Sequence, residues 1–475
     1  MRIHLFQTND VHSQLENYMR LAAKLRARRE QARRDGDIVL TFDIGDVLDR
    51  VRPETEVTLG RVNAAMMAEL GYDAWVFGNN EGLTVPVEKW DELRRLSQTT
   101  IMGSNMRTVH GTEFPGFRDF QVFLAEGIKI GIFGITPKYD KPYELLNVDI
   151  SHPFEAARTQ VKQLQKLGCD IIIALSHLGL WDDRKLAQQI EGIDVILGGH
   201  SHQFMKEAEW VNGTAVFQPG KHALTYGHTV VDYDLTAKHI IEVVSAPVEV
   251  DLHGPMDDKM LSVYRSYLPE IEHGLAEPIV TLPHRLPVQF NSESTLANVL
   301  VEGLFARYSC DIGLMMAGAL NASLRAGSVR RGHVHGACAT PTRPVLMTLS
   351  GAHLRAIIEK ALRPEYFNKR GFGFGFRGGV VGFMALSNAE VEFSVIHHEP
   401  CIDAFRIGGF PVHPDKLYRV VTCEYLWLSP VFEEFHQGQD VHVQVPLVRE
   451  ILLEALGNQK VLDRAKTRHY HLRKP

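Results

Sequence analysis

The segment Ile3–Ser13, IHLFQTNDVHS, joins a short apolar run to a group of polar side chains. Its first part, Ile3–Gln7, has the composition of a buried β-strand. In an extended chain, residues two positions apart point to the same side, so Asp10 and His12 can hold a common centre. A single Asp-x-His is more often a solvated turn, so its meaning depends on the rest of the chain.

Polar groups follow other apolar runs in the same way, and together they indicate one site. Runs rich in Ile, Val and Phe alternate with stretches of helical periodicity, which is typical of a layered α/β domain. Open α/β sheets place their ligands at the carboxyl ends of strands. The predicted strands are Ile3–Gln7, Ile38–Phe42, Ala74–Phe77, Ile128–Phe133, Ile171–Leu175, Val195–Leu197 and Ala215–Gln218. The further polar groups are Gly45-Asp46, Gly78-Asn79-Asn80-Glu81, Ser176-His177 and Gly199-His200-Ser201-His202.

The residue types in these groups select the kind of ligand. Carboxylate, amide and imidazole groups suit a divalent Mn, Fe, Zn or Co ion better than a thiolate-bound metal. The candidate ligands in these groups are too many for a single ion to bind. They suit two ions about 3.5–4 Å apart that share a carboxylate, as in two-metal hydrolases. The candidate metal ligands are Asp10, His12, Asp46, Asn79, His177, His200 and His202.

The order of these groups, D-x-H, G-D, G-N-x-E, S-H and G-H-x-H, resembles the calcineurin-like metallophosphatase superfamily. The wider run, with QPG at 218–220, is similar to its bacterial 5′-nucleotidase and UDP-sugar hydrolase branch, as a cytoplasmic variant with GNNE in place of GNHE. The resemblance continues at Glu293–Asn298, Leu349–Gly351 and Tyr418–Val420. It implies an α/β fold (α+β overall), a four-layer metallophosphatase sandwich with a C-terminal mixed α/β 5′-nucleotidase domain.

The resemblance also implies a domain organisation. Residues 1–250 would form a dinuclear metallophosphatase catalytic domain, and residues 281–475 a 5′-nucleotidase-like substrate-binding domain. The amphipathic stretch within residues 251–280 is interpreted as a helical linker between them. The basic tail after Arg464 is expected to be loosely ordered.

Carried over residue by residue, the resemblance assigns two metal sites. One ion would be held by Asp10, His12, Asp46 and His202, and the other by Asn79, His177, His200 and the same Asp46 as a bridge. A hydroxide between the ions would attack phosphorus in line, and both ions would stabilise the transition state. The implied cofactor is therefore a pair of divalent ions, Mn, Zn, Co or Fe.

One departure from the family pattern concerns the proton donor. The family reads GNHE followed two residues later by Asp, a His–Asp dyad that assists departure of the leaving group. This chain has Asn80 and Leu83 at those positions. His222, just after the QPG turn, is the candidate substitute donor. The candidate catalytic residues are therefore Asp46, Asn80 and His222.

A second departure concerns substrate binding. The family holds phosphate with a segment that reads NxGGIR, whereas this chain reads AGALN at 317–321. Arg325 or Arg343 is the candidate replacement. The family binds the nucleobase with two aromatic residues of the second domain, and Phe383 and Phe432 lie nearest those positions in the sequence.

Composition limits the partners of the chain. Its 475 residues predict two or three domains, and 51 basic against 57 acidic residues give a net charge of −6, unlike a basic nucleic-acid binder. Apolar tracts such as Val380–Leu386 are far shorter than the roughly 20 residues of a membrane span. The start of the sequence lacks an apolar signal region, and the five scattered cysteines fit a reducing compartment. We expect a cytoplasmic protein that binds a small-molecule nucleotide or phosphate ester, with no nucleic acid and no membrane.

The sequence thus predicts a dinuclear metal-dependent phosphoesterase that hydrolyses nucleotides. An alternative is a metal- and nucleotide-binding sensor, or a degenerate enzyme with little turnover, which the departures at Asn80 and Leu83 favour. A third reading is a cyclic-nucleotide phosphodiesterase or nucleotide-sugar pyrophosphatase. The complete set of metal ligands favours hydrolysis, because a sensor does not need two metal sites.

Overall fold

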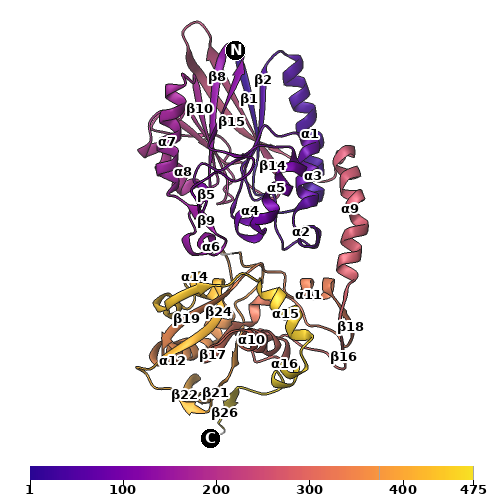
Figure 1. Ribbon diagram of the computed structural model, residues 1–475, viewed down its shortest axis with the longest axis vertical. Coiled ribbons are helices and arrows are strands. Elements are labelled where there is room, and N and C mark those ends of the chain that lie inside the picture. The colour runs from indigo at the N-terminus through magenta and orange to yellow at the C-terminus, as the bar shows by residue number, and fades with distance from the viewer. Residues whose placement is uncertain (374, 474–475) are drawn as a thin grey trace. The chain divides into compact units, whose positions relative to one another are not determined.

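The computed structural model describes residues 1–373 and 375–473. The chain divides into two compact units, Met1–Ile271 (unit 1) and Glu272–Pro475 (unit 2). In Figure 1 the indigo and magenta elements belong to unit 1, and most of the orange and yellow elements belong to unit 2.

The first sheet of unit 1 has the strand order β15-β14-β1-β2-β3-β4-β6. The strands from β1 to β6 run parallel, and β14 and β15 form an antiparallel hairpin at the other edge. Parallel neighbours bring their carboxyl ends, and the loops that follow, to one edge of the sheet. The strands are β1 (Arg2–Thr8), β2 (Ile38–Asp43), β3 (Ala74–Val76), β4 (Ile101–Met102), β6 (Phe117–Arg118), β14 (Thr225–Asp234) and β15 (His239–Glu249).

The second sheet of unit 1 has the order β12-β13-β11-β10-β8-β7. Its central strand β10 (Ile171–Ser176) is buried along its whole length, so its sequence IIIALS is continuously apolar until the last residue. The other strands are β7 (Phe120–Ala125), β8 (Ile128–Ile135), β11 (Val195–Gly198), β12 (Glu209–Val211) and β13 (Thr214–Phe217), and a separate small pair joins β5 (Met106–Thr108) to β9 (Val148–Ile150).

Apolar clusters show how these elements form layers. One cluster lies between the sheets and joins residues such as Leu5 of the first sheet to Ile173 of the second. A second cluster packs helices, among them α1 (Leu15–Arg34) and α3 (Arg61–Leu70), on the outer face of the first sheet. A third packs α7 (Pro153–Lys166) and α8 (Leu180–Gln189) on the second sheet. The helix–sheet–sheet–helix sandwich expected from the sequence is confirmed. The remaining helices of this part are α2 (Pro53–Thr58), α4 (Asn79–Thr84), η1 (Val87–Lys89), α5 (Trp90–Ser97) and α6 (Asp140–Leu145).

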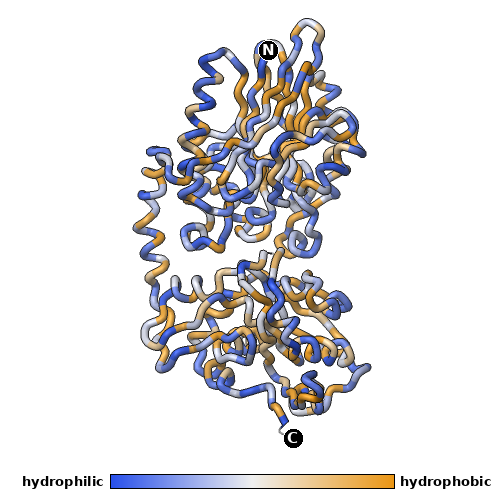
Figure 2. Tube along the Cα trace, turned by 180° about the vertical axis from the view of Figure 1, so that it is seen from behind, coloured by the Kyte–Doolittle hydropathy of each residue, from blue (hydrophilic) through white to orange (hydrophobic). Residues whose placement is uncertain are grey.

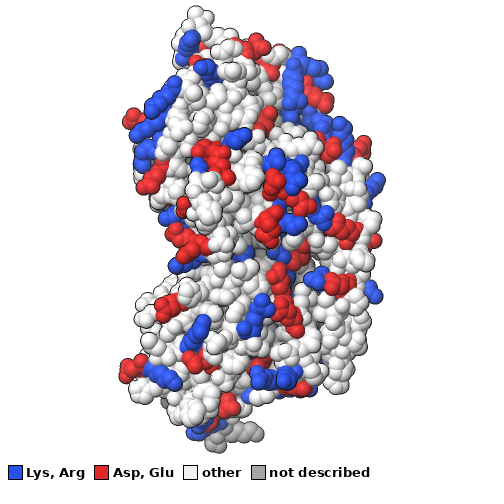
Figure 3. Space-filling model, viewed as in Figure 1, with Lys and Arg blue, Asp and Glu red and all other residues white. Residues whose placement is uncertain are grey.

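Figure 2 shows the hydropathy that underlies this layering, with long orange stretches along the strands of unit 1 and bluer outer helices. Figure 3 shows basic and acidic side chains interspersed over the face in view. Within the described residues, no helix has both the length and the apolar composition that crossing a bilayer requires.

Helix α9 (Asp258–Ala276) contains the boundary between the units. Met260 is fully buried in the apolar cluster around α1 and α3, and Tyr264 and Tyr267 pack against the same cluster. Pro269 lies inside the helix. The region expected to be a linker is therefore helical, but the first part of its helix is packed into unit 1.

Unit 2 is a mixed α/β unit. Its larger sheet has the order β20-β17-β24-β19-β25, and a smaller one has the order β23-β22-β21-β26. The C-terminal tail differs from expectation, because β26 (Tyr470–Leu472) pairs in parallel with β21 (Ala389–Ile396). The other strands are β16 (Pro278–Leu282), β17 (Ile312–Met316), β18 (Gly327–Arg330), β19 (Pro344–Ser350), β20 (Met384–Ser387), β22 (Glu399–Ile407), β23 (Phe410–Pro411), β24 (Leu417–Cys423) and β25 (Gln439–Val443). The helices are α10 (Thr295–Arg307), η2 (Ala317–Ala319), α11 (Arg331–Ala337), α12 (Gly351–Ala361), α13 (Pro364–Phe367), α14 (Glu424–Leu428), η3 (Glu433–Gln437), α15 (Val448–Leu456) and α16 (Gln459–Arg464).

Candidate metal centre

The polar groups predicted from the sequence meet at the carboxyl ends of strands from both sheets of unit 1. The loop after β1 is tied to the loop after β2, because the Asp10 N–H donates to the Gly45 carbonyl (2.9 Å). The side chain of Asp10 links the two sheets, because its Oδ2 accepts a hydrogen bond from the His200 N–H (2.9 Å). Five loops that are distant in the sequence thus form one site.

The candidate ligands form two clusters. Asp10, His12 and His202 form the first, and Asp46, His177 and His200 the second, with the ligand atoms in each within 4.8 Å of one another. Asp46 reaches toward both: its Oδ1 lies 3.4 Å from His177 Nε2, and its Oδ2 lies 3.9 Å from His12 Nε2. One carboxylate between two clusters is the arrangement that a bridging ligand requires.

Atoms around Asp46 fit divalent cations. Asn79 Oδ1 and His177 Nε2 are buried, and the described residues give neither of them a hydrogen-bond partner. Buried polar atoms normally have a partner, so these two atoms are explained if they are metal ligands. Gly78 keeps the space open: a Cβ there would lie 2.1 Å from Asp46 Oδ1 and 2.8 Å from His177 Nε2.

Hydrogen bonds on the outer side of the imidazoles orient them. His12 Nδ1 lies 3.1 Å from Asp49 Oδ2, and His177 Nδ1 lies 2.6 Å from the Ile44 carbonyl oxygen. Both contacts leave Nε2 directed at a cluster, as is usual for metal-binding histidines. His200 differs, because its Nε2 lies 3.3 Å from the Tyr139 hydroxyl, which leaves Nδ1 for the cluster.

The charges of the clusters set the protonation of their members. Burial alone would lower the pKa of His177, but the negative charge of Asp46 raises it to about 10. Burial and the neighbouring His177 lower the pKa of His200 to about 4. Although burial opposes ionisation of Asp46, the nearby histidines hold its pKa well below the usual range. A cation that binds here therefore meets an ionised Asp46 and displaces a proton from His177.

Glu81 fixes the backbone of the site, which the sequence did not reveal. Its fully buried carboxylate accepts hydrogen bonds from the backbone N–H groups of Asp46 (2.9 Å), Leu48 (2.8 Å) and Gly78 (2.9 Å). Burial and the charge of Asp46 raise the pKa of Glu81 to about 7, although these N–H groups partly offset the shift. Glu81 thus ties the loop after β2 to the loop after β3.

The ligand loops have unusual backbone conformations. Five candidate ligands have positive φ in the left-handed region, where residues with side chains are uncommon. These are Asp10 (49°), His12 (46°), Asp46 (55°), His200 (72°) and His202 (60°). Such conformations persist only where the surrounding structure enforces them, as the hydrogen bonds between these loops do.

The candidate catalytic residues lie at the clusters. Asn80 donates to Asp46 twice, from its backbone N–H to Oδ1 (2.8 Å) and from its side-chain amide to Oδ2 (2.6 Å). The ring of His222 lies 5.7 Å from that of His12. Burial and the charge of His12 lower the pKa of His222 to about 4, so at neutral pH it lacks the extra proton that an acid catalyst donates.

The candidate substrate residues belong to unit 2. Arg325 is exposed, whereas Arg343 is buried and its guanidinium donates to the Val445 carbonyl. Phe383 is 8% exposed and packs edge-on against Tyr470, and Phe432 is 1% exposed and stacks on Tyr366. Both rings thus have aromatic partners within unit 2, and their role in binding a nucleobase stays a prediction.

Asp49 and Tyr139 contribute to the site but were not singled out in the sequence, and Glu81 was named there only as a member of the polar group at 78–81. Asp49 follows Asp46 by three residues and Glu81 ends the GNNE motif, so proximity to a ligand was the available signal. For Tyr139, which follows β8, no signal distinguishes it from an ordinary aromatic residue.

Comparisons with known proteins match both parts of the chain. The family model described as calcineurin-like phosphoesterase matches residues 3–204, and the one described as 5′-nucleotidase, C-terminal domain, matches residues 278–429. The uncharacterized metallophosphoesterase YunD of Bacillus subtilis is 28% identical over 462 residues, which cover 95% of this chain and 98% of that protein. The 5′-nucleotidase of Rattus norvegicus is 31% identical over 225 residues, 42% of this chain and 38% of that protein.

Solved structures share the fold. The putative 5′-nucleotidase from Staphylococcus aureus, crystallised in complex with alpha-ketoglutarate, aligns over 100% of both chains with a TM-score of 0.70 and 17% identity. At this identity the likeness shows the fold alone. The two family matches together identify the chain as a hydrolytic phosphoesterase, with a calcineurin-like phosphoesterase domain over residues 3–204 followed by a 5′-nucleotidase C-terminal domain over residues 278–429.

Proposed function

We propose that this protein is a dinuclear metal-dependent phosphoesterase that hydrolyses nucleotides. The position of Asp46 carries the proposal, because one carboxylate reaches two clusters of ligand atoms. Two divalent cations held there would supply an activated water for in-line attack on phosphorus and positive charge for the transition state.

The side chains of the protein prepare this chemistry. Asp10, His12 and His202 would hold one cation, and Asn79, His177 and His200 the other, with Asp46 shared. Glu81 holds the Asp46 and Gly78 loops in register through three backbone hydrogen bonds. Asn80 donates from its backbone N–H and from its side-chain amide to the two oxygens of Asp46, which fixes the plane of that carboxylate.

Metal analysis combined with a phosphate-release screen tests the proposal. We expect two tightly bound ions per chain after reconstitution with Mn, Co, Zn or Fe. Nucleoside monophosphates, cyclic nucleotides and nucleotide sugars should each be assayed, because the family match does not define the substrate. The proposal is wrong if no metal gives more than one ion per chain. Two bound ions without turnover on any substrate would instead favour the sensor.

The variant Asp46→Asn is the first specific prediction. Without the negative bridge, two dications face one another with less compensation, so occupancy and activity should both be lost. A matched control is Asp232→Asn, since Asp232 forms an exposed ion pair with Arg2 in unit 1 and touches neither cluster. Elemental analysis of the two variants, purified side by side, makes the comparison. Full occupancy in Asp46→Asn would exclude a bridging role.

A further inference from the structure

A buried carboxylate on α8, that of Asp183, lies behind the two clusters without belonging to either of them. Its Oδ1 accepts a hydrogen bond from the Ser176 hydroxyl (2.5 Å), and its Oδ2 accepts one from the Gln218 side-chain amide (2.8 Å). Among the described residues, no cationic side chain forms an ion pair with Asp183. A buried carboxylate without a cation is a poor source of stability. When fully hydrogen-bonded, however, it fixes the geometry of its donors.

The contacts of Asp183 join three neighbouring strands of the second sheet, in the order β13-β11-β10. Ser176 is the last residue of β10, Gly198 is the last residue of β11, and Gln218 follows β13 directly. A Cβ at Gly198 would lie 2.3 Å from Asp183 Oδ2, so the carboxylate approaches β11 this closely only because the residue is a glycine. These strands run parallel, so one side chain touches the carboxyl ends of all three.

At the end of β10, this network holds the turn that carries His177. The Ser176 hydroxyl donates to Asp183, and its oxygen accepts a long hydrogen bond from the Leu178 N–H (3.4 Å). Ser176 and Leu178 stand on either side of His177 in the chain. The backbone at this candidate ligand is therefore fixed by a side chain of α8.

At the end of β11, the network reaches the loop that carries His200 and His202. Ser201 lies between these two histidines, and its hydroxyl donates to Gln218 Oε1 (3.0 Å). The same hydroxyl oxygen accepts from the first N–H of α8 (2.9 Å). Gln218 connects this loop to Asp183, because its amide oxygen accepts from Ser201 while its amide nitrogen donates to the carboxylate.

We propose that Asp183 is a positioning residue, which sets the geometry of the three histidine ligands that follow β10 and β11. The inference rests on the proposed function, because it concerns how the ligands of the two cations are held. In the first sheet, Glu81 holds the ligand loops through backbone N–H groups. Each sheet then contributes one buried carboxylate that orders the ligands without binding metal.

Asp183→Asn tests the role of this carboxylate, because it keeps the size of the side chain and reverses the polarity of one contact. The introduced amide can accept from Ser176, but its NH₂ group then faces the NH₂ group of Gln218. Rotation of the Gln218 amide would relieve this repulsion but would present its nitrogen to the Ser201 hydroxyl, so the change reaches the ligand loop.

The readout is Co²⁺ bound to the full chain. We expect the Co²⁺ affinity of Asp183→Asn, measured by competition with a chelator, to fall about tenfold. The visible absorption of the bound Co²⁺, which reports ligand geometry, should change as well. A role in stability alone would shift the thermal unfolding of the metal-free protein but would leave the affinity and the spectrum of the folded protein as they are.

Adding Gln218→Glu to Asp183→Asn should restore the network with the opposite polarity. One oxygen of the new carboxylate accepts from the introduced amide and the other accepts from Ser201, so every donor again has an acceptor. We expect this double variant to recover the wild-type Co²⁺ affinity and spectrum. Wild-type affinity in Asp183→Asn, or a loss that Gln218→Glu does not repair, would overturn the inference.

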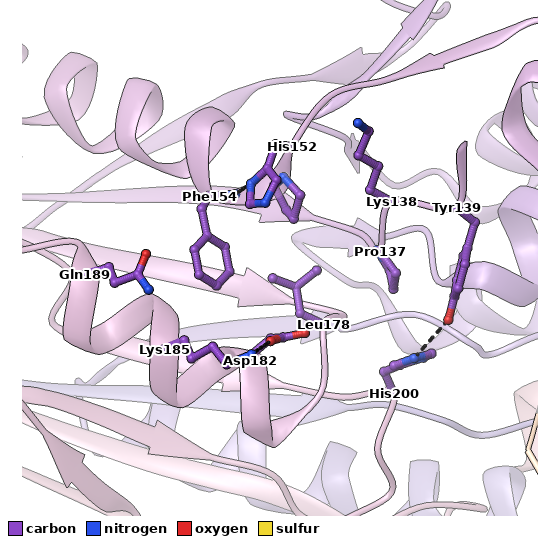
Figure 4. A pocket seen from close by; sticks show the side chains of 11 residues that line it. Pro137, Lys138, Tyr139, His152, Phe154, Leu178, Asp182, Lys185, Gln189 and His200 are labelled. Carbon is purple, nitrogen blue, oxygen red and sulfur yellow. Dashed lines mark hydrogen bonds and ion pairs between the residues drawn. The ribbon is translucent and has the colours of Figure 1, made fainter. Parts of the chain in front are cut away.

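Asp182→Asn is the matched control. Asp182 precedes Asp183 in α8, but it lines a cavity of about 530 Å³ and pairs with Lys185 at 2.9 Å (Figure 4). This variant should bind Co²⁺ as the wild type does. If Asp183→Asn does not fold, Ser201→Ala decides the question, because it cuts the network at the ligand loop. Weaker Co²⁺ binding by Ser201→Ala would then support the inference, and unchanged binding would overturn it.

The Co²⁺ measurements need no turnover, which separates this inference from the proposed function. Loss and recovery of Co²⁺ affinity in the two variants, without hydrolysis of any phosphate ester by the wild type, would support the inference and reject the proposed function. Hydrolysis of nucleotides with equal Co²⁺ affinity in all variants would support the proposed function and reject the inference. A wild type that binds no divalent metal would reject both.

Discussion

Asn80 shows how one residue changes the chemistry that the site can perform. Its backbone N–H and its side-chain amide both donate to the Asp46 carboxylate. The Asn80 amide cannot deliver a proton at neutral pH. Leu83, one helical turn further along α4, has no carboxylate that could orient a proton donor. Attack on phosphorus does not need these groups, but departure of an alkoxide does.

We therefore predict a steep dependence of rate on the leaving group. General acid assistance is worth about 10²–10⁴-fold, so aryl phosphates and phosphoanhydrides should react much faster than nucleoside monophosphates. The double variant Asn80→His, Leu83→Asp should flatten this dependence, whereas Asn80→His alone should do so less, lacking the carboxylate. The measurement is kcat/KM over a leaving-group series for all three proteins. A flat series in the wild type would show that another group already donates the proton.

Asp49 should influence metal affinity without being a ligand. Its Oδ2 lies 3.1 Å from His12 Nδ1, which fixes the ring and makes it a better donor. We expect Asp49→Asn to weaken metal binding about 10–100-fold, measured by competition with a chelator. Asp119→Asn, which changes a carboxylate paired with Arg107 instead, is the control and should bind metal normally. Equal affinity in both variants would mean that Asp49 serves only the fold.

At the scale of elements, the fully buried strand β10 was predictable from the sequence, whereas β14 and β26 were missed. β10 was found because burial on both faces makes it continuously apolar. β14 was missed, since its burial alternates and polar residues such as His228 and Asp232 interrupt the apolar pattern. β26 was missed because it exists through pairing with β21, about 80 residues away in the chain, and its own sequence YHL carries no apolar run.

Helix α14 begins at Glu424, and this carboxyl should make the stability of unit 2 depend on pH. Burial raises its pKa to about 7 from an ordinary 4.5, although Arg343 partly offsets the shift. The folded chain then holds a proton to higher pH than the unfolded chain. The free energy of unfolding therefore falls as pH rises between these two values.

Glu424→Gln removes this titration, so relative to the wild type it should gain stability, by about 2 kcal/mol between pH 5 and pH 8. Hydrogen exchange of the segment 417–428, compared between the proteins at each pH, measures the difference. Glu433→Gln, on the neighbouring η3, serves as the control. A difference between Glu424→Gln and the wild type that does not vary with pH would contradict the assignment.

At the scale of the whole molecule, helix α9 determines which fragment of the chain should be stable as an isolated unit 1. Met260 is fully buried in the unit 1 cluster, and Arg61 pairs with Glu270. A fragment that ends at Val250 removes this helix and exposes the surface beneath it. We predict that residues 1–271 give a more stable and less aggregating fragment than residues 1–250, by thermal unfolding and light scattering at equal concentration. Equal behaviour of the two fragments would show that α9 adds nothing to unit 1.

The sequence identified the candidate ligands that the structure brings together, but not the residues that surround them. Asp10, His12 and the other proposed ligands stood out because hard donors recur at strand ends at short spacing. The contacts of Glu81 and Tyr139 could not be found, since they join loops that only the fold brings together. The burial of Arg343 was likewise invisible, because residue type alone marks an arginine as an exposed cation.

The left-handed backbone of the ligand loops bears on how this family loses activity. Each such residue costs of order 1 kcal/mol that a glycine would not, and five candidate ligands have this conformation. Glycine in place of the partly exposed His202 would remove this cost, whereas glycine in place of Asp10 or Asp46 would also remove a carboxylate that holds the loops together. A lineage released from selection for catalysis can therefore gain stability when glycine replaces His202. Inactive descendants should keep the sandwich and melt at higher temperatures than their working relatives. High thermal stability in a protein of this fold can therefore accompany the loss of its metal centre and of its activity.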